Sequence, residues 1–350
     1  MKIVIRVDGH KRIGMGHLYR MLTLARYLRK HEEAEVEFVI RNNRHALNLI
    51  QSFDFPVYPL VFNLSYADET RVLECYLSDK KCDVVCVDLL KRCREKTYMS
   101  RLRRSARAVM VAFSDTHTRE EIAADLVFNA SVFQRPEYYG KEAGRVYFLG
   151  LDYVIMPEGG PGVSKRAAVR SMPERILICM GGSDHHDLTY HVLKAIDKSR
   201  YAFEIDTVVG STFFPPPRLD RFASALSHPA RVIYDPDGVQ DLLKQSDLAI
   251  TAGGTVLIER LRAGVPGLTI SQLRHQAALA SEIARRGAGV DLGIYSDLSS
   301  LELTAQFEKL YSNQNMRRRI ATIGRKMVDG LGLCRVASKI CEQIDPGRSV

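Results

Sequence analysis

Residues 2–28 read KIVIRVDGHKRIGMGHLYRMLTLARYL, a stretch that combines a strand pattern, a glycine-rich loop and a helix pattern. The apolar run KIVIRV (2–7) has the length of a buried strand. Apolar residues then recur at i, i+3 and i+4 spacing, which predicts a helix over about 17–30 whose buried face carries Leu18, Met21, Leu22, Ala25 and Leu28. A strand, a loop and a helix in this order are typical of a parallel α/β sheet.

The alternation of strand and helix patterns continues through the first half of the chain. Strands are predicted at 36–40, 57–60, 84–90, 108–113, 126–128 and 146–150, with helices over 44–52 and 68–79 between the earlier ones. The long apolar runs within VVCVDLL (84–90) and AVMVAF (108–113) indicate strands that are buried on both faces of a parallel sheet.

The Gly- and Pro-rich stretch MPEGGPGVSK (156–165) interrupts this pattern and predicts a linker, which we bound at 156–172. The alternation then resumes with strands at 176–180, 203–209, 231–234, 248–251 and 265–270, with helices over 188–198, 219–226, 239–245 (after Asp237 as N-cap) and 256–263, and with helices dominating from 276 to 343. We therefore expect two Rossmann-like α/β domains, residues 1–155 and 173–350, the second with a helical C-terminal segment. Ligands of such sheets bind at the carboxyl ends of the strands, so we expect the domains to face a cleft.

The composition of the 350 residues, 46% hydrophobic and 26% charged, is ordinary for a globular protein. The sequence lacks the roughly 18–20 consecutive apolar residues that a membrane span needs, and its start, MKIVIRVD, reaches an acid too early for a signal peptide. A cytoplasmic protein without an integral membrane segment is therefore expected. The seven cysteines form no C-x-x-C pair, and no histidine motif with metal spacing occurs, so we expect reduced thiols and no metal.

The formal net charge is +9, with basic clusters at Arg101–Arg104 and Arg317–Arg319. Both clusters fall on predicted helices, where solvated faces are the usual explanation. Because no aromatic residues alternate with these basic residues, we expect no nucleic-acid partner. The charge also suits an anionic small molecule or peripheral contact with an anionic membrane surface, and it does not choose between these.

The loop after the first strand carries Gly14, Gly16 and His17. Tyr19 stands where the third glycine of a dinucleotide-binding fingerprint belongs, so the loop gives only weak support for a dinucleotide site. The glycines allow a ligand to approach the backbone closely. A histidine at a helix N-terminus is expected to be neutral, because the helix dipole disfavours a second proton, and it can then act as a general base. The alternative is that His17 merely packs or caps the helix.

Three acids follow strands of the first half, namely Asp8, Asp88 and Asp115. Acids at strand carboxyl ends can bind sugar hydroxyls or orient a histidine, although each taken alone is more often a capping or loop residue.

Three loops of the second half also follow strands and precede helices. They carry Gly181, Gly182 and Ser183; Gly253, Gly254, Thr255 and Glu259; and His275 and Gln276. Glycines and hydroxyls before a helix can cradle a phosphate, and a carboxylate in the first helical turns can accept the hydroxyls of a ribose. Tight turns and solvated polar residues are the alternatives. Two glycine–hydroxyl loops together with Glu259 favour a nucleotide diphosphate.

Several of these motifs resemble one family when they are read together. Arg6-x-Asp8, Ile13-Gly-Met-Gly-His17 and Arg20 resemble the first loop of the UDP-2,4-diacetamido-2,4,6-trideoxy-altropyranose hydrolases of pseudaminic acid synthesis and of their relatives in spore-coat polysaccharide synthesis. The segments Cys179–Asp184, Ala252–Glu259 and Phe113–Asp115, and also Asn129, fall where that family has similar residues. The resemblance covers residues 1 to about 290, and the later motifs are shared with glycosyltransferases of the type B fold.

The resemblance implies a metal-independent UDP-sugar hydrolase without a cofactor, in which His17 activates water at the anomeric carbon and Asp8 orients His17 or a sugar group. It implies that the second domain holds UDP through its glycine loops and Glu259. Substrate contacts are expected from Arg6, Gly14, Gly16, Arg20, Asp88, Asp115 and Asn129 in the first domain, and from Gly181, Gly182, Ser183, Gly253, Gly254, Thr255, Glu259, His275 and Gln276 in the second.

Two departures from the family leave the sugar and the acceptor open: Leu89-Leu90 follow Asp88, and the chain beyond about 295 is longer than expected. A glycosyltransferase that uses a UDP-sugar donor is the alternative function. A binding protein without catalysis is a third possibility, against which His17 argues because binding alone needs no base. The expected partner is a UDP-sugar, and the expected state is a monomer.

Overall fold

The computed structural model describes residues 1–10, 14–89, 96–116, 122–134, 137, 145–158, 169–182, 184, 186–210 and 218–344. The chain divides into two compact units. Unit 1 comprises Met1–Glu158 and Leu331–Val350, and unit 2 comprises Gly159–Gly330. Most of the predicted linker, together with Ser183 and Leu90, lies outside the described residues.

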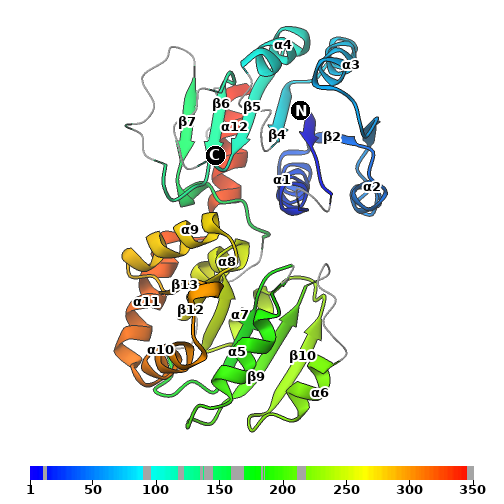
Figure 1. Ribbon diagram of the computed structural model, residues 1–350. Coiled ribbons are helices and arrows are strands. Elements are labelled where there is room, and N and C mark those ends of the chain that lie inside the picture. The colour runs from blue at the N-terminus through cyan, green and yellow to red at the C-terminus, as the bar shows by residue number, and fades with distance from the viewer. Residues whose placement is uncertain are drawn as a thin grey trace. The chain divides into compact units, whose positions relative to one another are not determined.

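The described residues of unit 1 form a seven-stranded parallel sheet in the order β3-β2-β1-β4-β5-β6-β7 (Figure 1). Its strands are β1 (Lys2–Val7), β2 (Glu35–Arg41), β3 (Val57–Leu60), β4 (Val84–Asp88), β5 (Val109–Ser114), β6 (Leu126–Asn129) and β7 (Val146–Leu149). One face packs against α1 (Gly16–Glu32), α2 (Arg44–Gln51) and α12 (Gly332–Ile344), and the other against α3 (Tyr66–Asp79) and α4 (Lys96–Ala106). A 3-10 turn, η3 (Leu151–Tyr153), follows β7.

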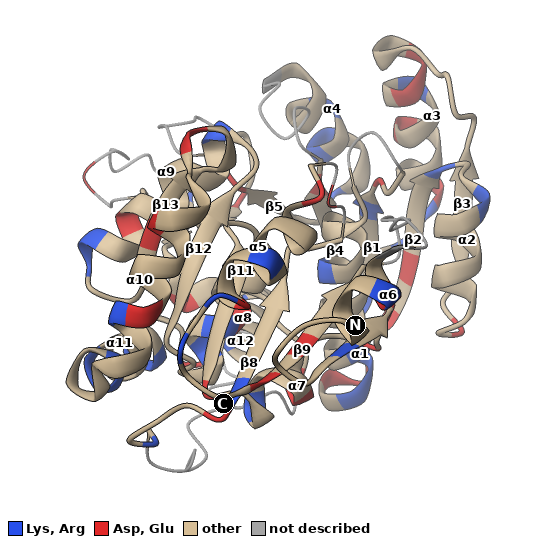
Figure 2. Ribbon diagram, turned by 60° about the horizontal axis from the view of Figure 1, so that its bottom comes forward, with Lys and Arg blue, Asp and Glu red and all other residues tan. Residues whose placement is uncertain are grey.

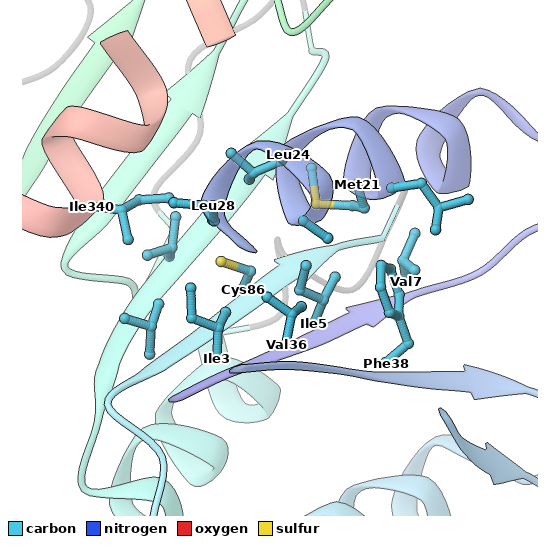
Figure 3. Close-up of a cluster of buried hydrophobic side chains, with 14 of the residues drawn as sticks. Ile3, Ile5, Val7, Met21, Leu24, Leu28, Val36, Phe38, Cys86 and Ile340 are labelled. Carbon is cyan, nitrogen blue, oxygen red and sulfur yellow. The ribbon is translucent and has the colours of Figure 1, made fainter. Parts of the chain in front are cut away.

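Helix α1 packs on the sheet through the apolar face that its spacing predicts. Leu18, Met21, Leu22, Ala25 and Leu28 are all buried. Figure 3 shows Met21, Leu24 and Leu28 above side chains of β1, β2 and β4, with Ile340 of α12 beside Leu28. This packing fixes the axis of α1, and therefore also the place where its first turn meets the carboxyl end of the sheet.

The C-terminal helix departs from the expected domain boundary. We expect residues 173–350 to form one domain, but the chain from Leu331 onward belongs to unit 1, where α12 packs against α1, β5 and η3. Val336 and Ile340 are buried in the same core as α1. A Cβ at Gly332 would lie 2.2 Å from the carbonyl oxygen of Val154, so glycine allows α12 to start against the segment after η3.

The described residues of unit 2 form a six-stranded parallel sheet in the order β10-β9-β8-β11-β12-β13. The strands are β8 (Arg175–Cys179), β9 (Glu204–Val209), β10 (Ala230–Tyr234), β11 (Leu248–Ala252), β12 (Gly267–Ser271) and β13 (Val290–Ile294). The helices are α5 (Leu188–Ile196), α6 (Arg218–Ser224), α7 (Gln240–Gln245), α8 (Thr255–Ala263), α9 (Arg274–Arg285), α10 (Ser300–Ser312) and α11 (Gln314–Met327), with a 3-10 turn η4 (Tyr295–Asp297). Helices α5, α6 and α10 contribute to the core on one face, and α7 and α8 to the core on the other.

Unit 2 departs from the sequence predictions at three points. Strand β13 interrupts the helices predicted from residue 276 onward; its residues are all half-buried, which gives a weak strand pattern. Helix α7 has Val239 rather than Asp237 as its N-cap, without a side-chain hydrogen bond. Arg317 is fully buried instead of solvated, and its guanidinium donates to the carbonyl oxygens of Leu310 (2.9 Å) and Ser171 (2.7 Å).

Acidic and basic residues are interspersed on helices such as α3 and α10 (Figure 2). Among the described residues, no helix is both long and apolar enough to cross a membrane. The cysteines that the structure describes are free thiols.

Candidate active site

His17 and Asp88 form the central pair of polar groups at the carboxyl end of the unit 1 sheet. His17 lies in the first turn of α1, and Asp88 is the last residue of β4. The Nδ1 atom of His17 lies 2.8 Å from Oδ1 of Asp88. The Asp88 side chain is 1% exposed and that of His17 is 13% exposed. Within the described part of the chain, Nε2 of His17 makes no hydrogen bond, so it is the nitrogen that remains for a ligand.

Arg20, one turn further along α1, links Asp88 to Asp115. Its Nε and Nη2 atoms donate to the two oxygens of Asp88 at 2.9 and 2.6 Å, and its Nη1 atom donates to Asp115 at 2.7 Å. Asp115 follows β5, and its second oxygen lies 3.9 Å from Nδ1 of His17. The structure thus brings together His17, Arg20, Asp88 and Asp115, four of the residues that the sequence singles out.

The pKa of His17 is shifted in the direction opposite to the one expected from the helix dipole. Burial lowers the pKa of His17, but the hydrogen bond to Asp88 and its negative charge outweigh burial, so the pKa lies above its usual value. Burial raises the pKa of Asp88, but the charge of Arg20 and the contact with His17 outweigh it, so Asp88 is held ionised. The anion behind the imidazole therefore makes His17 a stronger base than an isolated histidine.

Asp8 does not orient His17, contrary to the first of the two roles considered for it. Its two oxygens accept hydrogen bonds from Arg6 Nη1 (2.6 Å) and Nη2 (2.9 Å), and one of them also accepts the backbone N–H of Arg41 (3.0 Å). Arg6 is 1% exposed and Asp8 is 8% exposed. The side chains of Arg6 and Asp8 are therefore paired with each other. Asp88, and not Asp8, is the carboxylate that orients the imidazole of His17.

Among the described residues, nothing crowds Gly14 and Gly16 at the start of α1. Gly14 has a φ of +80°, which favours glycine, and its N–H donates to the carbonyl of His10 at 2.9 Å. A Cβ built at Gly14 or Gly16 would have no non-neighbouring atom of the described residues within 4 Å. Met15, the N-cap of α1, provides no side-chain hydrogen bond. Since the first amides of a helix have no partners inside the helix, they can bind an oxygen of a ligand here.

Asn129, at the end of β6, has an internal role in the structure. Its Nδ2 atom donates to the carbonyl of Thr116 (3.1 Å), and its Oδ1 atom accepts the N–H of Ser131 (3.0 Å). It is 1% exposed, so it fixes the loops after β5 and β6 rather than offering its amide to a ligand.

In unit 2, helix α8 begins without a capping side chain directly after Gly253 and Gly254. Glu259 lies in the second turn of this helix, and its carboxylate makes no hydrogen bond to the described residues. Burial raises the pKa of Glu259 to about 7, against the smaller opposing effect of Arg262. An uncapped helix start and an unpaired, partly desolvated carboxylate are suited to a phosphate and a hydroxyl pair, respectively.

The other glycine loop of unit 2 differs from the predicted phosphate cradle. Asp184 is 2% exposed, and its two oxygens each accept a 2.8 Å hydrogen bond, from the N–H groups of Leu188 and Thr189. The first turn of α5 is therefore occupied by a carboxylate, which repels a phosphate. Gly181, with a φ of +85°, and Gly182 provide a close backbone approach instead: a Cβ at Gly210 would lie 2.5 Å from the Cα of Gly182.

Gln272 and Gln276 connect three of the loops at the carboxyl end of this sheet. Gln272 Nε2 donates to the carbonyl of Met180 (2.9 Å), and Gln276 Oε1 accepts the N–H of Gln272 (3.0 Å). A Cβ at Gly253 would lie 2.9 Å from the carbonyl oxygen of Gln276, so the β11 and β12 loops touch. Thr255 and His275 are exposed in the first turns of α8 and α9.

Sequence reasoning missed three residues of unit 1 that surround Arg6 and Asp8, namely Arg41, Glu69 and Tyr98. The position of Arg41 at the end of a predicted strand is a signal that could have identified it; Glu69 and Tyr98 lie on helices and give none. Among the residues described, no group of three or more His, Cys, Asp or Glu is arranged to hold a metal. The expected absence of a metal stays a prediction.

Comparison with known proteins supports the resemblance seen in the motifs. No family model matches the chain. The chain is 27% identical over 347 residues to the spore coat polysaccharide biosynthesis protein SpsG of Bacillus subtilis, covering 97% of both chains. It is 22% identical over 297 residues to the UDP-2,4-diacetamido-2,4,6-trideoxy-beta-L-altropyranose hydrolase of Campylobacter jejuni, covering 83% of this chain and 99% of that protein.

Solved structures show the same fold. MurG of Acinetobacter baumannii matches with a TM-score of 0.72 at 15% identity, covering 98% of this chain and all of that one. The calicheamicin glycosyltransferase CalG4 matches with a TM-score of 0.64 at 16% identity, covering 99% of each chain. The chain is therefore homologous to SpsG and, more distantly, to the altropyranose hydrolase, and it has the two-domain fold of the type B glycosyltransferases.

Proposed function

We propose that the protein is an enzyme of polysaccharide or nonulosonic acid synthesis that hydrolyses a UDP-sugar, releasing UDP by attack of water at the anomeric carbon. The observation that carries the proposal is the His17–Asp88 pair. Nδ1 of His17 lies 2.8 Å from Oδ1 of Asp88, and Nε2 of His17 is left for a ligand. A histidine oriented by a buried carboxylate is the arrangement of a general base.

The reaction needs one base and one stabilised leaving group. Nε2 of His17 takes a proton from water while the water oxygen forms a bond to the anomeric carbon. The bond from that carbon to the diphosphate oxygen breaks, and UDP leaves with the electron pair. Asp88 stabilises the imidazolium that forms, because it stays ionised beside Arg20. UDP is already a good leaving group, so no strong acid is required opposite the base.

The proposal assigns the nucleotide to unit 2. The uncapped start of α8 supplies amide donors and a positive dipole end for phosphate, and Glu259 supplies an acceptor for the ribose hydroxyls. Asp184 makes α5 the less suitable of the two helix starts. The C. jejuni relative is a UDP-sugar hydrolase, which supports this choice of substrate.

A glycosyltransferase is the second candidate. The solved structures of this fold include calicheamicin and spinosyn sugar transferases, although their low identity concerns the fold alone. The same Nε2 atom can take the proton of an acceptor hydroxyl instead of the proton of water.

The test is to incubate the protein with UDP-activated diacetamido-trideoxyhexoses without an acceptor and to measure released UDP. We expect release by the wild-type protein, release reduced by at least a thousandfold in His17→Asn, and unchanged nucleotide binding in that variant. His31→Asn, on the same helix but paired with Glu158 on the surface, is the matched control and should be fully active. EDTA should leave the rate unchanged.

UDP release that requires a glycan or lipid acceptor would show that the protein is a transferase and not a hydrolase. Nucleotide binding without turnover under either condition would mean that the protein is not an enzyme of this type.

A further inference from the structure

A buried group of charged side chains lies behind the candidate site of unit 1, and the proposed reaction does not use it. At its centre is Glu69 of α3, whose side chain is fully buried. Burying a carboxylate is costly unless it is paired and hydrogen-bonded. Here Oε1 accepts from Arg6 Nε (3.2 Å) and Nη2 (3.0 Å), while Oε2 accepts from Arg41 Nε (2.9 Å) and Nη2 (2.7 Å). The Tyr98 hydroxyl lies 3.2 Å from Oε1.

Both arginines connect Glu69 to the carboxyl end of the sheet. Arg6, on β1, binds both oxygens of Asp8, and Asp8 accepts the backbone N–H of Arg41 at the end of β2. Two arginines, one aspartate and one glutamate thus join the ends of β1 and β2 to α3. Their formal charges sum to zero, which reduces the cost of burying them.

Arg41 also holds the loop that follows β3. Its Nη1 atom donates to the carbonyl of Phe62 (2.7 Å), and its Nη2 atom donates to the carbonyl of Leu64 (2.6 Å). The ring of Phe62 packs edge-on against His10, with ring centroids 5.7 Å apart. His10 accepts the N–H of Gly14, two residues before α1 begins. A chain of contacts therefore runs from Glu69 through Arg41, Phe62 and His10 to the segment that precedes His17.

These contacts concern the ends of strands and the loops beyond them rather than the apolar layers of the core. A buried ionic network of this kind is a weak source of stability compared with apolar packing, and its best-supported role is to specify geometry. We propose that Glu69 is a positioning residue, which fixes the loop carrying Gly14 to His17 through Arg6 and Arg41. Its effect on turnover rests on the proposed function, whereas its effect on the loop does not.

Replacement by glutamine tests this role with little change in shape. A glutamine has one oxygen and one NH2 group, so it can accept from one arginine but presents donors to the other. One guanidinium then loses its acceptor at position 69 and keeps only its other contacts, to Asp8 for Arg6 or to the loop carbonyls for Arg41. Glu74→Gln is the matched control, because Glu74 lies on the same helix and pairs with Arg101 near the surface.

The experiment measures hydrogen exchange in peptides covering 8–19 and 60–66, and UDP release, well below the melting temperature. For Glu69→Gln we expect at least tenfold faster exchange in both peptides and at least tenfold lower kcat. UDP affinity and the pH midpoint of the rate should be unchanged, because the His17–Asp88 pair is intact. Glu74→Gln should match the wild type. Arg41→Gln, which keeps Glu69 paired with Arg6, serves if Glu69→Gln does not fold.

The proposal is overturned if exchange in both peptides stays within twofold of the control, and equally if exchange rises while kcat does not change. A lower melting temperature alone, with unchanged kcat of the folded protein, would reduce Glu69 to a structural residue. Absence of turnover in the wild type would contradict the proposed function but would leave the exchange result as the test of Glu69.

Discussion

Replacing Asp88 with asparagine is the most direct test of the chemistry assigned to His17. The substitution keeps the shape of the side chain and removes its charge. In the structure Asp88 is 1% exposed, accepts two hydrogen bonds from Arg20 and lies 2.8 Å from Nδ1 of His17. Every one of these contacts involves a charge that asparagine lacks.

The expected loss follows from the neighbours of Nδ1. The Nη2 atom of Arg20 lies 3.0 Å from Nδ1. Once the carboxylate is gone, this nitrogen or the asparagine amide donates to Nδ1, which forces the proton of the neutral imidazole onto Nε2. Nε2 then has no lone pair with which to accept a proton. In the serine protease triad the equivalent change lowers kcat by about 10⁴, so we expect a loss of roughly 10³–10⁴, or about 4–5 kcal/mol in the barrier.

The pH dependence should change in a defined direction. In the wild type the rate rises with pH as His17 loses its proton, with a midpoint above the usual histidine pKa because Asp88 raises it. In Asp88→Asn, burial and Arg20 both lower the pKa of His17, while only the more distant Asp115 still raises it. The residual rate should therefore reach its plateau at lower pH.

The assay is UDP release at pH 5 to 9, combined with nitrogen NMR of the His17 ring to identify its tautomer and pKa. Since removing one partner of a buried ion pair costs about 3–5 kcal/mol of stability, rates are measured well below the melting temperature. Asp115→Asn, which removes a 45% exposed carboxylate from the same group, is the comparison and should lose less than tenfold. A kcat of Asp88→Asn within tenfold of wild type, or an imidazole that keeps its proton on Nδ1, would refute the reasoning.

Three other perturbations test separate parts of the structure. Since the pKa of Glu259 is about 7, its ionised fraction should rise roughly tenfold from pH 6 to pH 8, and the affinity for a UDP-sugar, measured by calorimetry, should rise with it. Glu259→Gln should abolish this pH dependence of the affinity. An unchanged pH dependence in Glu259→Gln would contradict the ribose assignment. The Cβ of Gly16→Ala would meet no non-neighbouring atom of the described residues within 4 Å, so the variant should keep the melting temperature while raising KM. An unchanged KM would show that no substrate approaches there. Gly332→Ala, whose Cβ would lie 2.2 Å from the Val154 carbonyl oxygen, should lower the melting temperature of unit 1 by several degrees, with UDP affinity as the unaffected control.

The alternation of patterns was sufficient to predict both parallel sheets, because strands buried on both faces leave long apolar runs in the sequence. Strands β1 and β3 begin and end at the predicted residues, and the other predicted strands differ by one or two residues at an end. Strand β13 was not predicted, because it lies at the edge of its sheet and its residues are only half-buried. Asp291 and Gly293 therefore interrupt its apolar pattern. Helix α12 has an ordinary amphipathic pattern, and such a pattern does not say which core it joins.

Partner choice among the acids was not predictable for a topological reason. Asp8, Asp88 and Asp115 look equivalent in the sequence, since each follows a strand. The sheet order β2-β1-β4-β5 separates them: Asp8 is bound by Arg6 and by the end of β2, whereas Asp88 ends the strand on the other side of β1, where α1 places His17 and Arg20. Strand order is a long-range property that the local patterns do not contain. The raised pKa of His17 follows from the same pairing, which outweighs the helix N-terminus from which a neutral imidazole was predicted.

A base at His17 would not by itself distinguish hydrolysis from transfer, since water and a sugar or lipid hydroxyl both offer an O–H to Nε2. What distinguishes them is the space beside the imidazole. A site that hydrolyses needs room for one water, while a transferase needs a surface for a second substrate. Within the described residues a Cβ at Gly14 or Gly16, next to His17, would be uncrowded, and Arg41, paired with Glu69, anchors the loop after β3. We therefore expect the choice of nucleophile to depend on the loops that the buried ionic network is proposed to position, rather than on the His17–Asp88 pair.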